Sequence, residues 1–60
     1  MTTTERIEAV WIEMDGDATA QDIVMALIDE DVSRGEYEGC SVELEMAYSE
    51  YLGAAERMGV

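Results

Sequence analysis

The first apolar positions of the chain recur with the period of a helix. They stand at i, i+3, i+4 and i+7, which gathers them into one stripe on a helical surface. These positions are Ile7, Val10, Trp11 and Met14. Thr2 and Glu5 precede the stripe with the spacing of a capping box. The pattern predicts a helix from about Thr3 to Met14.

A turn signal, Asp15-Gly16-Asp17, separates this segment from a second helical pattern. The apolar face of that second pattern consists of Ala20, Ile23, Val24, Leu27 and Ile28. Thr19 and Asp22 again have the spacing of a helix cap. We expect this helix to run to about Ser33, with Gly35 placed to end it.

The last segment carries two competing periods. Between Cys40 and Met46 apolar and polar residues alternate, as in a strand with one buried face. Over a longer window a helical stripe is formed by Leu44, Ala47, Tyr48, Tyr51, Leu52, Ala55 and Met58. The longer pattern favours a helix from about Ser41 to Met58, in which Gly53 is the weak point.

Together these patterns predict an all-α fold, a small three-helix domain over residues 1–60. The alternative is an α+β fold with short strands near 7–14 and 40–46 that pair with each other, because the first of these segments is rich in β-branched and aromatic residues. Sixty residues allow one domain at most, and a core of that size is marginal. A homodimer, or ordering on a partner, would relieve that marginality.

Charge is the dominant feature of the composition. Fifteen acidic residues against three arginines give a net charge of −12 at pH 7. Such a surface lacks the cations that neutralise the phosphates of nucleic acids and anionic lipids. We therefore expect a basic protein partner, with no direct nucleic acid and no membrane. The N-terminal segment has no basic region and no apolar run of signal-peptide length, so we expect a cytoplasmic protein.

The residue types argue against catalysis. Without His or Lys the chain lacks the usual proton shuttle and Schiff-base amine, and Cys40 is the only thiol. The segment from Asp15 fails the calcium-loop pattern, because its sixth and twelfth positions are Ala20 and Ala26. We expect that the protein is not an enzyme and that it has no cofactor and no metal site.

The four aromatic residues have different expected places. Trp11 lies on an apolar stripe and is expected in the core. Tyr48 and Tyr51 share a stripe and are expected at the edge of the core or of an interface. Tyr37 lies between two glutamates in a connector, which fits either a binding surface or a half-buried loop position.

The acidic residues are dense along the predicted length. Three helices of about fifteen residues are roughly 22 Å long. Twelve net charges over that length is about one per 1.9 Å, close to the one per roughly 1.7 Å of duplex DNA. The predicted partner-binding patch consists of Asp29, Glu30, Asp31, Glu36 and Glu38, extended by Glu43, Glu45 and Glu50.

In size, charge and lack of catalytic residue types, the whole chain resembles the small acidic phage proteins that block host defence, the DNA-mimic inhibitors and acidic anti-CRISPR proteins. The resemblance implies an inhibitor that occupies the positively charged nucleic-acid channel of a CRISPR effector or nuclease. It assigns no role to any single residue, because that class shares charge and not sequence. One alternative is an acidic adaptor or antitoxin-like module that binds one basic protein through an apolar helix face. Another is an acidic surface that serves only solubility, including at high salt.

Overall fold

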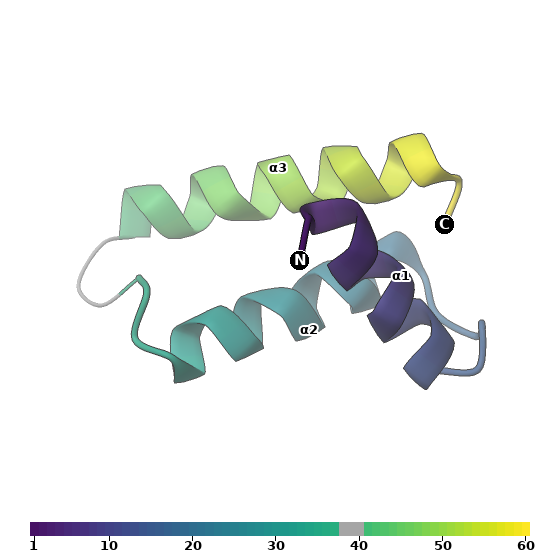
Figure 1. Cartoon of the computed structure of the whole chain (residues 1–60). Helices are drawn as coiled ribbons and strands as arrows, with labels where there is room; N and C mark the ends of the chain where they lie inside the picture. The colour runs from purple at the N-terminus through teal and green to yellow at the C-terminus, as the bar shows by residue number, and fades with distance from the viewer. Residues whose placement is uncertain (38–40) are drawn as a thin grey trace.

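Three helices form the structure, a computed structural model that describes residues 1–37 and 41–60. Helix α1 spans Thr3–Glu13, α2 spans Ala20–Ser33 and α3 spans Ser41–Met58. The predicted all-α, three-helix fold is confirmed within these ranges (Figure 1). The alternative with strands is wrong over 7–14 and 41–46, because the longer helical periods prevail over the local alternation. Cys40 lies outside the described residues.

The predicted caps begin the first two helices. The Thr2 hydroxyl oxygen accepts a hydrogen bond from the Glu5 backbone N–H at 3.2 Å. At the start of α2 the capping box is complete: Thr19 accepts from the backbone N–H of Asp22, and the Asp22 carboxylate accepts from the backbone N–H of Thr19. These bonds satisfy N–H groups that a helix start leaves without partners.

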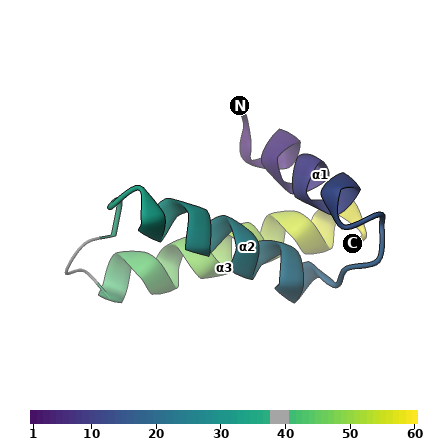
Figure 2. The ribbon, with the colours of Figure 1, turned by 90° about the horizontal axis from the view of Figure 1, so that it is seen from below.

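Helices α2 and α3 lie side by side and antiparallel, and α1 crosses one side of the pair (Figures 1 and 2). Figure 2 shows α1 over the half of the pair that contains the C-terminal part of α3, so the N-terminal part of α3 is covered by α2 but not by α1. The Cα atoms extend over 33 × 19 × 19 Å. The buried apolar core consists of Ile7, Ile23, Val24, Leu27, Ile28, Tyr51, Ala54 and Ala55.

The aromatic residues divide between core and surface. Tyr51 is buried and Tyr48 is half-buried, as expected for the edge of a core. The prediction for Trp11 is wrong, because its side chain is 39 % exposed. Helix α1 crosses the pair, so the later part of its apolar stripe lies at the periphery, where Trp11 borders a shallow pocket of about 240 Å³ with Met58 and Val60.

Replacing Gly16 with alanine is expected to destabilise the protein by about 1 to 2 kcal/mol. Gly16 has φ +72°, and a Cβ at this position would lie 3.2 Å from the Trp11 ring. Gly35→Ala is the matched control, since Gly35 has φ +76° but a Cβ there would have no heavy atom within 4 Å. Thermal unfolding followed by circular dichroism should show the larger loss for Gly16→Ala. Equal losses would mean that the contact with Trp11 contributes nothing.

Candidate functional site

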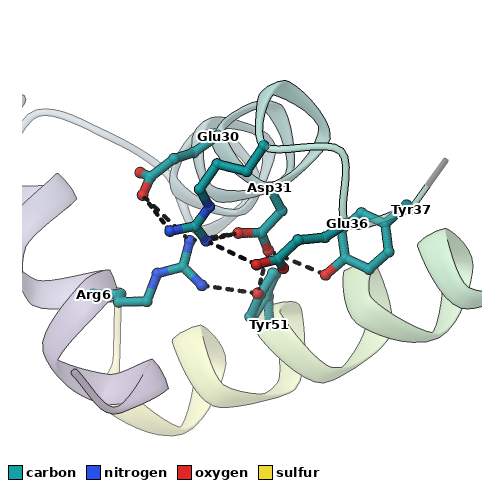
Figure 3. Close-up of polar contacts among 7 residues, drawn as sticks. Arg6, Glu30, Asp31, Glu36, Tyr37 and Tyr51 are labelled. Atoms are coloured by element: carbon teal, nitrogen blue, oxygen red, sulfur yellow. Dashed lines mark hydrogen bonds and ion pairs between the residues drawn. The ribbon is translucent and has the colours of Figure 1, made fainter.

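A buried carboxylate joins the three helices in the middle of the molecule (Figure 3). Asp31 of α2 has no solvent exposure. Its Oδ1 accepts hydrogen bonds from Arg6 of α1 at 2.9 Å and from Arg34 at 2.5 Å. Its Oδ2 accepts from the hydroxyls of Tyr51 of α3 at 2.5 Å and Tyr37 at 3.1 Å. We refer to Arg6, Asp31, Arg34, Tyr37 and Tyr51 as the Asp31 cluster.

The register of α2 places this carboxylate inside. Asp31 follows Val24 by seven residues and Leu27 by four, so it continues the buried face of the helix. A carboxylate near a helix C-terminus meets the unfavourable end of the helix dipole. The two guanidinium groups offset that effect, and Arg6 also donates to the Tyr51 hydroxyl at 3.0 Å. The cluster therefore holds α1, α2 and α3 in one arrangement.

The cluster shifts the ionisation of its members. Burial alone would raise the pKa of Asp31, but hydrogen bonds from Tyr51, Arg6, Arg34 and Tyr37 outweigh burial and lower that pKa to about 2. Burial, together with hydrogen bonding to Tyr51 and Asp31, raises the pKa of Tyr37. At neutral pH the carboxylate is charged and the Tyr37 hydroxyl stays protonated. Both carboxylate oxygens of Asp31 accept hydrogen bonds from two donors each.

The same arginines neutralise part of the predicted patch. Glu30 lies 3.7 Å from both Arg6 and Arg34, and Glu36 lies 3.6 Å from Arg34. Both glutamates are about half exposed. With Asp31 they form a group of three carboxylates and two guanidinium groups, which leaves a net charge of only −1. The arginines therefore offset most of the negative charge of these three residues, contrary to the expectation from the sequence.

The predicted patch is thus only partly at the surface. The prediction that Asp31 lies at the surface is wrong, because its carboxylate is fully buried and hydrogen-bonded. Asp29, Glu30 and Glu36 are exposed, whereas Glu38 lies outside the described residues. The extension is better supported as a surface: Glu43, Glu45 and Glu50 of α3 are all exposed, and no ion pair involves them within the described ranges.

Most of the remaining carboxylates are also exposed. Thirteen of the fifteen acidic residues are exposed in the described part of the chain, and two of these thirteen, Glu30 and Glu36, form ion pairs. The other eleven have no ion-pair partner among residues 1–37 and 41–60. They are Glu5, Glu8, Glu13, Asp15, Asp17, Asp22, Asp29, Glu43, Glu45, Glu50 and Glu56.

The charge density along the molecule is lower than the sequence suggests. The Cα extent of 33 Å replaces the expected length of roughly 22 Å, because α3 alone has 18 residues and so extends about 27 Å. Twelve net charges over 33 Å is about one per 2.8 Å. This value lies between the one per roughly 1.7 Å of a DNA duplex and the one per roughly 3.4 Å of a single strand of it.

The sequence did not predict that two apolar residues lie exposed among the glutamates of α3. Val42 and Met46 are 64 % and 67 % exposed. The alternation from Cys40 to Met46 places them on the face assumed to be buried in a strand. In the helix they instead lie one turn apart on its outer side, with Glu43 and Glu45 beside them. The signal for this arrangement was present in the helical register of α3.

A groove of about 390 Å³ beside α1 and α2 includes Arg6, Glu13, Glu30 and Arg34, whose charges sum to zero. Among the described residues no group of His, Cys, Asp and Glu could hold a metal ion. Within the same ranges no helix has both the length and the apolar character needed to cross a membrane.

Comparison with protein-family models, curated proteins and solved structures finds no match to this chain.

Proposed function

We propose that the protein inhibits a nucleic-acid-binding protein of host defence, a CRISPR effector or a nuclease, in the cytoplasm of the host cell. An acidic surface that mimics DNA would occupy the basic nucleic-acid site of that target. The observation that carries the proposal is the separation of charge: two of the three arginines are held at the Asp31 cluster, while eleven exposed carboxylates have no ion-pair partner in the described ranges.

The physical basis is competition for cations. Exposed carboxylates can accept charge-assisted hydrogen bonds from the Arg and Lys side chains that otherwise contact phosphates. A strongly negative molecule is also steered towards a positive channel, which accelerates association at low salt. The 33 Å extent of the molecule is comparable to one turn of B-DNA, about 34 Å. The outer side of α3 is the proposed contact surface, because its glutamates are exposed.

Neutralising α3 is expected to weaken inhibition. The test titrates the protein into a panel of purified CRISPR effectors and nucleases and measures their binding to duplex DNA by mobility shift. For a target that the protein displaces from DNA, the variant E43Q/E45Q/E50Q should need at least tenfold more protein, since each glutamine removes an attraction to the basic site. Raising the salt concentration should weaken the wild-type protein more than this variant.

A second charge variant provides the control. E8Q/E13Q/D17N removes the same number of charges from exposed positions on α1 and the turn after it. It should retain most of the inhibition if α3 makes the contact. Equal losses in the two variants would show that net charge alone acts, without a defined surface. If the protein displaces DNA from no member of the panel, the proposal is contradicted.

A second candidate function is an adaptor or antitoxin-like module that binds a basic protein through an apolar face. The observation in its favour is the exposure of Trp11, Ile12 and Met58, at 39 %, 59 % and 39 %. Here Trp11→Ala should impair partner binding more than E43Q/E45Q/E50Q does. The DNA mimic should show the opposite order in the same displacement assay.

A further inference from the structure

The outer side of α3 has the residue spacing of a coiled-coil seam. Val42, Met46, Ser49 and Gly53 follow one another at i, i+4, i+7 and i+11, the spacing of alternating d and a positions. The first three are exposed and Gly53 is half-buried. Figures 1 and 2 show α1 at the other half of α3, and the exposure of Val42 and Met46 shows that α2 leaves their side uncovered.

Carboxylates flank this seam on both sides. With Val42 at a d position, Glu43 and Glu50 occupy e positions and Glu45 occupies a g position. All three are exposed and have no ion pair in the described ranges. In coiled coils the e and g residues select the partner by charge. Two exposed apolar residues, Val42 and Met46, between acidic flanks therefore fit a helix that carries Arg or Lys at its own e and g positions.

A second copy of the chain does not fit this face. Whether two α3 helices paired parallel or antiparallel, glutamates at e and g would meet glutamates, and such like-charge contacts are unfavourable. Nucleic acid would meet the same repulsion, and exposed Val42 and Met46 offer nothing to a phosphate backbone.

The exposed apolar residues of α2 do not form an equivalent surface. Met25 and Val32 are 49 % and 51 % exposed and lie two turns apart. The helical register places Asp22 and Asp29 on one side of them only, while the other side turns towards buried Ile28. Of these two helices, only α3 has exposed apolar residues at coiled-coil spacing with carboxylates on both sides.

From this arrangement we infer that the seam of α3, residues 42 to 53, binds one amphipathic basic helix of the target, with the apolar stripe of that helix on Val42 and Met46 and its cations against Glu43, Glu45 and Glu50. The inference rests on the proposed function, since it names the part of the target that the acidic surface engages. It adds an apolar component to the binding, which salt does not screen. The contact is centred on Val42 and Met46, because the Arg57 guanidinium lies beside Gly53, 3.6 Å from the place of a Cβ there.

A synthetic peptide tests the inference without knowledge of the target. The probe is a helix of about three heptads with Leu at a and d and Arg at e and g, whose like charges keep it monomeric. Binding is measured by fluorescence anisotropy of the labelled peptide. A scrambled peptide of the same composition has equal charge without the stripe, and should bind about tenfold more weakly.

Variants of the protein locate the contact. V42A/M46A should weaken peptide binding about tenfold, whereas the matched pair M25A/V32A, which also truncates one Val and one Met, should leave it unchanged. Amide shifts in NMR spectra should concentrate on α3. Equal effects of the two pairs, equal binding of the scrambled peptide, or shifts centred outside α3 would each overturn the inference. Circular dichroism of both variants establishes that they are folded.

The outcomes separate the two proposals. Peptide binding at α3 without displacement of DNA from any effector or nuclease would leave the inference intact and reject the proposed function. Displacement of DNA that depends on Glu43, Glu45 and Glu50 but not on Val42 and Met46 would support the proposed function and reject the inference.

Discussion

Replacing Asp31 with alanine is expected to lower the free energy of unfolding by about 3 kcal/mol. The substitution removes the acceptor for four donors, from Arg6 of α1, Tyr51 of α3, and Arg34 and Tyr37 after α2. Removing one member of a buried ion pair costs about 3 to 5 kcal/mol, because the remaining charge is left without a partner. The exposure of Arg34, at 51 %, favours the lower end of that range, about 3 kcal/mol.

This loss is large for so small a domain. Sixty residues at roughly 0.05 to 0.15 kcal/mol each give a total stability of about 3 to 9 kcal/mol. The measurement is thermal or urea unfolding followed by circular dichroism. Asp31→Asn keeps the shape of the side chain and one acceptor oxygen, so its loss should be smaller than that of Asp31→Ala.

The neighbouring aspartate is the control. Asp29 is exposed and has no ion pair within the described ranges, so Asp29→Ala should change stability by no more than about 0.5 kcal/mol. Both substitutions remove one carboxylate from the last part of α2, so net charge cannot account for a difference between them. Similar stabilities of the two alanine variants would show that the Asp31 cluster contributes little to the fold.

The helices were predictable because their signals are local. Thr19 and Asp22 lie three residues apart, and the cap that they form needs no other part of the chain. The choice between strand and helix for 41–46 required a window long enough to include Tyr51 and Ala55. Seven residues with alternating polarity resemble a strand. A buried stripe that continues over several further helical turns identifies the segment as a helix.

The burial of Asp31 was not predictable in the same way, since it depends on contacts distant in sequence. Its position in the sequence fits the buried face of α2. Carboxylates are nevertheless usually exposed, so the sequence predicts Asp31 at the surface. What reverses that rule is Arg6, 25 residues away, together with Tyr51, 20 residues away. No spacing along the chain indicates that α1 delivers a guanidinium group to that place.

The exposure of Trp11 and the true charge density also depend on tertiary geometry. An apolar stripe predicts burial only where a partner covers it, and α1 crosses the pair instead of running along it (Figure 2). Likewise, the sequence supplies the number of charges but not the distance over which they spread. The 33 Å extent of the molecule moved the density below that of a duplex.

Stability should pass through a maximum as the pH is lowered from 7. A net charge of −12 destabilises the compact state by self-repulsion, and that charge decreases towards the isoelectric point of about 4.1. Unfolding free energy should therefore rise between pH 7 and about pH 4. Added salt at pH 7 should raise it too, because it screens exposed charges.

Below the maximum Asp31 reverses the trend. Its pKa is lowered from 3.8 to about 2 in the folded protein, so its contribution is complete above pH 3.8 and is lost as the pH falls towards 2. The difference corresponds to about 2 kcal/mol at neutral pH. Urea unfolding at a series of pH values measures both limbs of the profile.

Two variants should alter the two limbs of the pH profile separately, because the acid limb depends on buried Asp31 and the other limb on exposed carboxylates. Tyr51→Phe removes the hydroxyl that donates to Oδ2, so the pKa of Asp31 should rise towards 3.8 and the acid limb should become shallower. E43Q/E45Q/E50Q removes exposed charge, so it should flatten the limb between pH 7 and 4 and leave the acid limb in place. A wild-type profile that stays level between pH 3.8 and 2 would show that Asp31 is not held as a charged group in the folded protein.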